Sequence, residues 1–347
     1  MSTKKAGIRE ISEQAGVAMS TVSHALNGTA TISDQVRSRV LGVARDLGYL
    51  DRRQAKGAIA TLGKVMIVVP EGALPDNDVN LVSWTILSAL SRDCEARGLK
   101  LVPFSLHDDR PVAEVISAAR SSGVDGIILL NDDRNDLLEA ICATGIPAVL
   151  INGEDPNMHV DSVTPGNRFA AQKAVNWLIS LGHRRIMHLT WPGRKTVRRR
   201  LDGFKDAMAE HDLPEAAAVV VMAKGFEPHY GEAAVAEWLA RTPDLAGISA
   251  IFSAADNLAF GAIKALKAAG IRVPEDISVM GFDGVALGEL HVPALTTVSI
   301  PLEQFGREAL SLLEQRALAR GGRRASHRLE LGCEIVERAS VAAPKPR

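Results

Sequence analysis

Two segments of the sequence carry side chains whose types and spacing suit contact with a charged or polar partner. The first lies near the N-terminus and holds Met19, Ser20, Thr21, Ser23 and His24. Hydroxyl groups of this kind reach base edges or phosphates of DNA. The second is a basic run, Arg194, Lys195, Arg198, Arg199 and Arg200. It fits a site for an anionic ligand such as a sugar acid or sugar phosphate, because a guanidinium pairs well with such groups, and it equally fits the solvated start of a surface helix.

Helical periodicity surrounds the first segment. Apolar residues at 8, 11 and 15 share one face of a helix, and Gly16 permits a tight turn after it. A second helix begins near residue 18 or 19 and ends at Asn27 and Gly28, and Ser33 is a suitable N-cap for a third helix. A helix, a turn with Gly and a second helix form the helix-turn-helix pattern, whose second helix enters the major groove of DNA. The same periodicity also fits a three-helix module that does not bind DNA.

The charges are divided unevenly along the 347 residues. Residues 1–60 hold nine Lys or Arg and five Asp or Glu, a net charge of +4. The remainder holds 31 Lys or Arg and 36 Asp or Glu, a net charge of −5. A basic head on an acidic body favours a polyanion-binding module joined to a body with another task. A basic N-terminus that is merely solvated would give the same charges.

From residue 64 onward, short runs rich in Val, Ile and Leu alternate with helical stretches. We expect strands at 65–69, 100–104, 126–130, 148–151, 185–189, 219–222, 250–253, 278–281 and 296–299, with helices between most of them, for example at 84–97, 169–181, 203–210, 231–240 and 258–269. This alternation predicts an α/β body of parallel sheets flanked by helices. Its length fits two sheets with a crevice between them, and ligands of such folds bind beyond the carboxyl ends of the strands.

Several short strings stand at a shared, recognisable spacing. In the head they are Ala15-Gly16-Val17, Thr21-Val22-Ser23, Leu26-Asn27-Gly28 and Leu47-Gly48-Tyr49, and in the body they lie at 123–126, 181–186, 200–204, 250–252, 272–279, 281–283 and 293–297. Together they resemble the LacI/GalR family of transcription regulators over nearly the whole chain. The resemblance implies an N-terminal all-α helix-turn-helix head. It further implies two doubly wound parallel-sheet subdomains, like those of a periplasmic sugar-binding protein, with a cleft between them.

For the head, the resemblance implies that Met19, Ser20 and His24 occupy the main base-reading positions. Thr21, Ser23 and Asn27 are the further DNA-binding candidates of this helix. His24 stands where the family often has Arg, so it can donate a hydrogen bond but lacks the two-pronged contact with guanine.

The resemblance also implies a hinge at 51–62 that folds on DNA. Arg52, Arg53 and Lys56 are expected to contact phosphates. Ala58 stands where the family inserts a Leu into the minor groove, and the larger Ile59 beside it is the candidate to replace that wedge. A plain solvated linker is the alternative.

For the body, the resemblance implies an effector site in the cleft. Arg200 matches a family Arg that hydrogen-bonds the ligand. Asp283 matches a ligand-binding carboxylate of the family, and Phe226 matches an aromatic residue that stacks on the ligand. Trp191 is a second stacking candidate. Asp256 stands at the Asp of an Asn-Asp pair that the family often has, and this chain has Ala255 in place of the Asn. Departures at 165–167, 255 and 284 remove polar contacts typical of sugar-binding members, which puts a simple hexose in doubt. As alternatives to these binding roles, Phe226 would be an ordinary residue of the hydrophobic core and Arg200 a solvent-exposed charge.

The domain limits expected from this reading are 1–50 for the head, 51–62 for the hinge and 63–340 for the body. One subdomain would hold 63–162 and 293–322 and the other 163–292 and 323–340, with a loose tail at 341–347. Paired heads would match a pseudo-palindromic operator, so a homodimer on double-stranded DNA is expected.

Other classes of protein find little support. No apolar run reaches the roughly 20 residues of a membrane helix, and no secretory signal is evident. The three cysteines suggest neither disulfides nor a metal site, so we expect the protein to reside in the reducing cytoplasm. No motif of a nucleotide-binding, hydrolytic or zinc enzyme is present, and no cofactor is expected. The sequence therefore predicts a non-enzymatic, effector-controlled repressor. A cytoplasmic small-molecule-binding protein, or an enzyme acting on a carbohydrate in the cleft, is the alternative.

Overall fold

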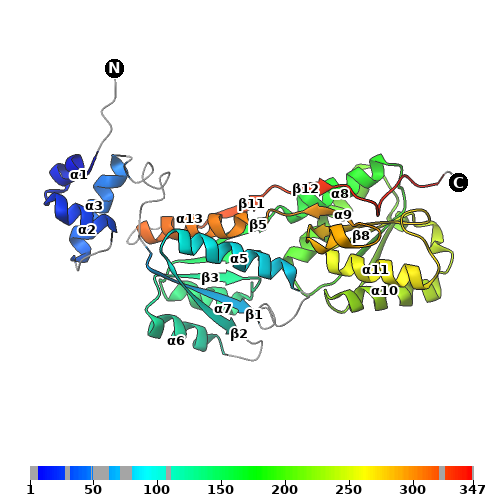
Figure 1. Cartoon of the computed structure of the whole chain (residues 1–347), viewed down its shortest axis with the longest axis horizontal. Helices are drawn as coiled ribbons and strands as arrows, with labels where there is room; N and C mark the ends of the chain where they lie inside the picture. The colour runs from blue at the N-terminus through cyan, green and yellow to red at the C-terminus, as the bar shows by residue number, and fades with distance from the viewer. Residues whose placement is uncertain are drawn as a thin grey trace, which may run out of the picture.

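The computed structural model describes residues 7–27, 32–47, 49, 62–70, 80–106, 111–319 and 325–345, and shows a small helical head followed by two α/β subdomains along the long axis (Figure 1). The hinge candidates Arg52, Arg53, Lys56, Ala58 and Ile59 lie outside the described residues, as do the side chain of Asn27 and Gly28. Within the described ranges, no helix is both long enough and apolar enough to cross a membrane.

The head consists of α1 (Ile8–Ala15), α2 (Met19–Asn27) and α3 (Asp34–Asp46). Gly16 ends α1 with a left-handed φ of 65°, which confirms the tight turn expected there. The Ser33 hydroxyl accepts the backbone N–H of Val36 at 3.5 Å and caps α3, also as expected. The apolar faces meet in a small core of Ile11, Ala15, Val22, Ala25, Leu26, Val40 and Ala44. The apolar face of α2 packs into this core, so the opposite face of α2 points toward solvent.

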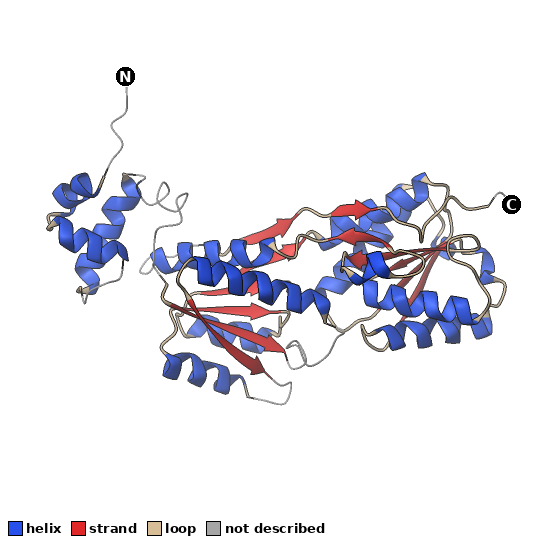
Figure 2. Ribbon diagram, in the orientation of Figure 1, coloured by secondary structure: helices blue, strands red, loops and turns tan. Residues whose placement is uncertain are grey.

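The first subdomain contains a parallel sheet in the order β11-β5-β4-β3-β1-β2. Its strands are β1 (Lys64–Pro70), β2 (Lys100–Leu106), β3 (Gly126–Leu130), β4 (Ala148–Ile151), β5 (Asp161–Pro165) and β11 (Arg328–Leu331). Helices cover both faces (Figure 2): α5 (Leu81–Ala96) and α13 (Gln304–Leu318) on one, α6 (Val112–Ser122) and α7 (Asn135–Ala143) on the other. Neighbouring residues such as Ile127 and Ile128 therefore enter different cores, which explains why the strands read as continuous apolar runs.

The second subdomain repeats this plan in the order β12-β10-β9-β8-β6-β7. Its parallel strands are β6 (Ile186–Thr190), β7 (Ala218–Met222), β8 (Ala250–Ser253), β9 (Ser278–Asp283) and β10 (Thr296–Ser299), and β12 (Glu334–Val336) is antiparallel at the edge. On one face lie α8 (Asn167–Ser180) and α9 (Lys195–Glu210), and on the other α10 (Pro228–Arg241) and α11 (Asp256–Ala268). The short α12 (Leu287–Leu290) follows β9, and single 3-10 turns occupy Glu215–Ala217 and Leu245–Gly247.

The chain crosses between the sheets three times, as expected, but each crossing lies later in the chain than expected. Residues 163–165 belong to β5 of the first sheet, although 163–292 was assigned to the second subdomain. Thr296–Ser299 pairs with β9 in the second sheet, although 293–322 was assigned to the first subdomain. Arg328–Leu331 pairs with β5 in the first sheet, although 323–340 was assigned to the second subdomain. The crossings therefore follow β5, β10 and β11. Alternation of strands and helices cannot reveal this, because it does not say which sheet a strand joins.

The segment after residue 340, expected as a loose tail, is docked over residues 341–345. The carbonyl of Ala342 lies 3.0 Å from Nε2 of His183 and accepts the Ser278 hydroxyl at 3.0 Å. Lys345 pairs with Asp276 at 2.9 Å. The tail therefore closes the far end of the second subdomain.

Candidate functional site

A cavity of about 1150 Å³ lies where the carboxyl ends of strands from both sheets face each other. The first subdomain contributes Pro70 at the end of β1, Asn131 after β3 and Asn152 after β4, and also Asn80, Leu81 and Val82 at the start of α5. The second contributes residues at or after the carboxyl ends of β6, β7, β8 and β9 and on α9, with Trp191, Arg194, Arg200, Phe226, Ala255 and Asp283 among the lining residues. A molecule in this cavity would touch both subdomains at once.

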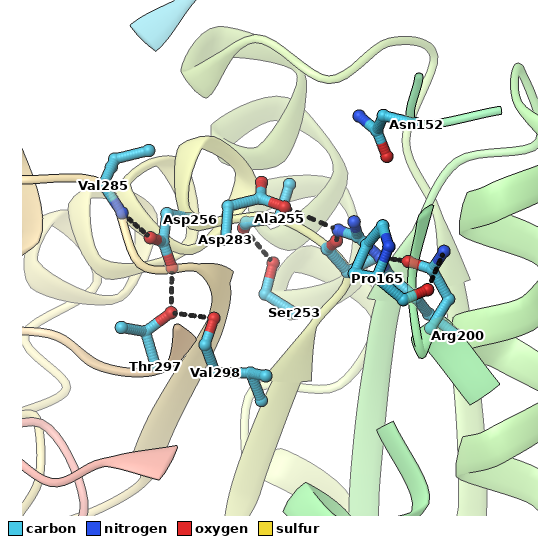
Figure 3. A network of polar contacts seen from close by, with 12 residues as sticks. Asn152, Pro165, Arg200, Ser253, Ala255, Asp256, Asp283, Val285, Thr297 and Val298 are labelled. Carbon is cyan, nitrogen blue, oxygen red and sulfur yellow. Dashed lines mark hydrogen bonds and ion pairs between the residues drawn. The ribbon is translucent and has the colours of Figure 1, made fainter. Parts of the chain in front are cut away.

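Arg200 and Asp283 form an ion pair on the wall of the second subdomain (Figure 3). Nη1 of Arg200 lies 2.9 Å from Oδ1 of Asp283 and also donates to the carbonyl of Ala254. Nε donates to Oδ1 of Asn167 at 2.9 Å, and the guanidinium lies 3.8 Å from the ring centroid of Phe282. Arg200 is only 4% exposed, so it is not the solvated charge that remained an alternative. It is a fixed, buried cation with its anion beside it.

Asp283 occupies an unusual backbone conformation. Its φ is 124°, a region that favours glycine, and conformations of this kind cost on the order of 1–3 kcal/mol. Burial raises the pKa of Asp283, and the neighbouring Arg200 acts in the opposite direction. Strain of this kind persists only where the surroundings hold the residue in place.

Asp256, expected to contact the effector, lies beneath the cavity wall and does not line it. It is fully buried; Oδ1 accepts the Thr297 hydroxyl at 2.6 Å and Oδ2 the backbone N–H of Val285 at 2.9 Å. A Cβ at Gly281 would come within 2.1 Å of Oδ1, so only glycine leaves room for this carboxyl. Burial first, and the charge of Asp283 second, raise the pKa of Asp256 to about 7. Asp256 thus positions the loop that carries Asp283.

The two aromatic candidates lie close together. The ring centroids of Trp191 and Phe226 lie 5.8 Å apart with an angle of 37° between the ring planes, and both rings line the cavity. They follow β6 and β7, which are adjacent in the sheet. An apolar ring or sugar face therefore has an aromatic surface available in the second subdomain.

Two asparagines of the first subdomain were missed by the sequence reasoning. Asn131 and Asn152 have left-handed φ angles of 61° and 53° at the ends of β3 and β4. Nδ2 of Asn131 donates to the Ser83 hydroxyl at 2.7 Å, and Nδ2 of Asn152 donates to Oδ1 of Asn131 at 2.8 Å. The available signal was an Asn directly after a buried strand, since Asn tolerates this conformation and places an amide at the binding edge.

The basic run at the start of α9 bridges the two subdomains. Nζ of Lys195 donates to the carbonyl of Asp133 at 2.6 Å, and Nε of Arg199 pairs with Oε2 of Glu154 at 3.3 Å. Glu154 is 5% exposed at its side chain and also pairs with Arg328. Arg198 alone of the run is exposed, with only backbone contacts to Pro192 among the described residues. A plain solvated helix start is therefore wrong for most of this run.

The exposed face of α2 carries the DNA-binding candidates of the head. Met19, Ser20 and His24 are exposed, whereas Thr21 and Ser23 are partly buried. Within the described residues, no group of three or more His, Cys, Asp or Glu is placed to hold a metal ion.

Known proteins share this combination of head and body. The family model for bacterial regulatory proteins of the lacI family matches residues 7–51, and that for a periplasmic binding protein-like domain matches 175–341. The HTH-type transcriptional repressor PurR of Pectobacterium atrosepticum is 30% identical over 344 residues, which cover 97% of each chain.

Among solved structures, the complex of the transcriptional regulator CelR with cellobiose aligns with a TM-score of 0.69 and 27% identity, covering 96% of this chain and 99% of its own. The lac repressor dimer bound to operator and the anti-inducer ONPF aligns with a TM-score of 0.71, covering 98% of this chain and 100% of its own. At 21% identity, that second likeness supports the fold alone.

Proposed function

This chain belongs to the LacI family of bacterial regulatory proteins, and on that premise we propose that it is a DNA-binding transcriptional repressor controlled by a small molecule. The observation that carries the proposal is the presence, in one chain, of a helix-turn-helix head and a cavity lined by both subdomains of the body. In this proposal the head binds DNA, and a ligand in the cavity controls the affinity of that binding.

In this proposal α2 lies in the major groove, where Met19, Ser20 and His24 reach base edges. Thr21, Ser23 and Asn27 complete the DNA-binding set of this helix. The hinge side chains Arg52, Arg53 and Lys56 contact phosphates, and Ile59 beside Ala58 takes the place of a minor-groove wedge. Two copies of the chain bind a pseudo-palindromic operator with half-sites about one helical turn apart.

Control of DNA binding follows from ligand contact with both subdomains. A ligand that meets Asn152 on one side and Trp191, Phe226, Arg200 and Asp283 on the other binds best when the subdomains are held at one particular separation. It therefore shifts the body toward that arrangement, and the body sets the spacing of the two heads. The size of the effect is limited by the difference in ligand affinity between the two arrangements.

We further propose that the cavity binds its ligand reversibly and does not convert it, and that the protein acts in the cytoplasm, where its DNA is. The carboxylate of Asp283 is held by Arg200 rather than free to act as a base, which supports binding over catalysis. The rival enzyme hypothesis predicts product formation from a cavity ligand.

The experiment that tests the proposal selects duplexes from a random pool with the full chain and measures their affinity by fluorescence anisotropy. We expect a preferred sequence, with affinity that falls steeply as salt rises because Lys and Arg contacts release counterions. Phe226→Ala is expected to abolish the response to a cavity ligand while the ligand-free protein still binds the duplex. Absence of any preferred duplex at low salt contradicts the proposal.

A further inference from the structure

Arg194 is a cation in the cavity with no ion pair among the described residues. It is the N-cap residue of α9, lines the cavity, and donates through Nη2 to the backbone carbonyl of Asn152 in the opposite subdomain. Its Nε is buried and has no acceptor in the described part of the chain. An N–H group left without an acceptor in a buried place is destabilising, and more so when the group is charged.

The neighbouring carboxylates are engaged elsewhere. Asp283 pairs with Arg200 at 2.9 Å, and Asp132 with Arg134 at 2.9 Å. Asp133 accepts the backbone N–H of Glu154 at 3.0 Å and attracts Arg194 only through space. Burial lowers the pKa of Arg194 to about 10, and Asp133 acts against that shift. Arg194 is therefore a charged guanidinium that Asp133, Asp283 and Asp132 attract through space but that makes no ion pair among the described residues.

An acceptor without a partner lies on the facing wall. Oδ1 of Asn152 is buried and has no donor in the described part of the chain, although Nδ2 of the same amide is engaged by Asn131. In Figure 3, Asn152 is joined to none of the other residues drawn and stands apart from the Arg200–Asp283 contacts. The cavity therefore offers one unmatched cationic donor and one unmatched acceptor, on opposite subdomains.

We propose that the effector carries a carboxylate or phosphate group that pairs with Arg194, together with a hydroxyl or N–H group that donates to Oδ1 of Asn152. This inference rests on the proposed function and narrows it to an anionic effector. Arg200 already makes an ion pair with Asp283 at 2.9 Å, whereas Arg194 makes none among the described residues, so Arg194 is the cation left to pair with the anion. Since Arg194 and Asn152 belong to different subdomains, a ligand with both groups joins them.

The test uses the full chain and two pairs of related probes, each with one acidic and one neutral member. Isothermal titration calorimetry compares D-gluconate with D-glucose, and D-ribose 5-phosphate with D-ribose. A charge-assisted hydrogen bond contributes about 1.5–3 kcal/mol, so at least one acid should bind about tenfold to a hundredfold more tightly than its neutral parent. Arg194→Gln should remove that preference, and Arg194→Lys should retain part of it.

Arg198→Gln is the matched control, since Arg198 lies on the same helix, is exposed and meets only the backbone of Pro192 among the described residues. Its preference for the acid should equal that of the wild type, and circular dichroism checks that each variant is folded. Tighter binding of a neutral parent, an unchanged preference in Arg194→Gln, or no binding of any acid overturns the inference. Operator binding that responds to a neutral sugar would overturn it too, but would leave the proposed function standing.

Discussion

Removal of the Asp283 carboxylate tests how the cavity wall is held together. In Asp283→Ala, Arg200 would keep its bonds to Asn167 and Ala254, but its guanidinium, 4% exposed, would lose the carboxylate 2.9 Å away. A buried cation stripped of its anion costs about 3–5 kcal/mol. Alanine keeps the Cβ that strains the backbone at a φ of 124°, so the substitution brings no relief of backbone strain. We therefore expect the free energy of unfolding to fall by about 3–5 kcal/mol.

The assay is urea-induced unfolding followed by circular dichroism. Asp283→Asn keeps an oxygen acceptor for Nη1 of Arg200 and should lose less. The double variant Arg200→Met, Asp283→Ala removes both charges and should recover part of the loss of Asp283→Ala, because no buried charge is left unpaired. A loss below about 1 kcal/mol in Asp283→Ala, the range of exposed ion pairs, would refute the reasoning that this pair is buried and tightly held.

Three further predictions concern other parts of the chain. The pKa of Asp256 is raised from 3.8 to about 7 in the fold, so the stability that this group contributes below about pH 4 is lost as the pH rises through about 7. Asp256→Asn should therefore gain stability relative to wild type between pH 5 and pH 8 in urea titrations, and a constant difference would contradict this. Glu154→Gln should lower the free energy of unfolding by about 2 kcal/mol, because the buried carboxylate serves both Arg199 and Arg328. The control Glu303→Gln, at a carboxylate 75% exposed, should change it by less than about 0.5 kcal/mol, and equal losses would count against the bridge. His24→Ala should weaken binding to the selected duplex about tenfold, whereas Glu13→Ala on α1 should not; anisotropy titrations in which both weaken alike would speak against base contact by His24.

The architecture of the head and the positions of most strands follow from sequence pattern. Spacing of apolar residues placed Ile11 and Ala15 on one face of a helix, and both are buried in the core of the head; Gly16 and Ser33 marked a helix end and a helix start by their backbone preferences. In the body, continuous apolar runs predicted most of the strands, because these strands are buried on both faces of their sheets. Such signals are local, so one stretch of sequence suffices to see them.

Non-local features escaped prediction. The strands β5 and β11 contain Asp161 and Arg328, polar residues that are accommodated because the Asp161 carboxylate pairs with Arg316 at 2.7 Å and Arg328 pairs with Glu154. No periodicity marks such strands. Sheet membership at the crossings was misassigned for the related reason that it depends on which surface the chain reaches after a loop.

The site was predicted in part. Arg200, Asp283 and Phe226 line the cavity, as the resemblance to a family implied, and so does Trp191, which was expected because it follows a strand. Asp256 was expected at the ligand and lies one layer below it, a difference of depth that sequence position does not encode. The bridging role of Glu154 was missed because its partners are distant in the chain.

The central claim, that a molecule in the cavity and DNA on the head influence each other, is tested most directly by measuring both affinities on the same protein. Anisotropy titration of the selected duplex with and without a saturating cavity ligand gives one ratio of dissociation constants, and calorimetry of the ligand with and without the duplex gives the other. Because coupling is reciprocal, we predict the same ratio from both, at least about fivefold away from one. A ratio of one for a ligand shown to occupy the cavity would contradict the account.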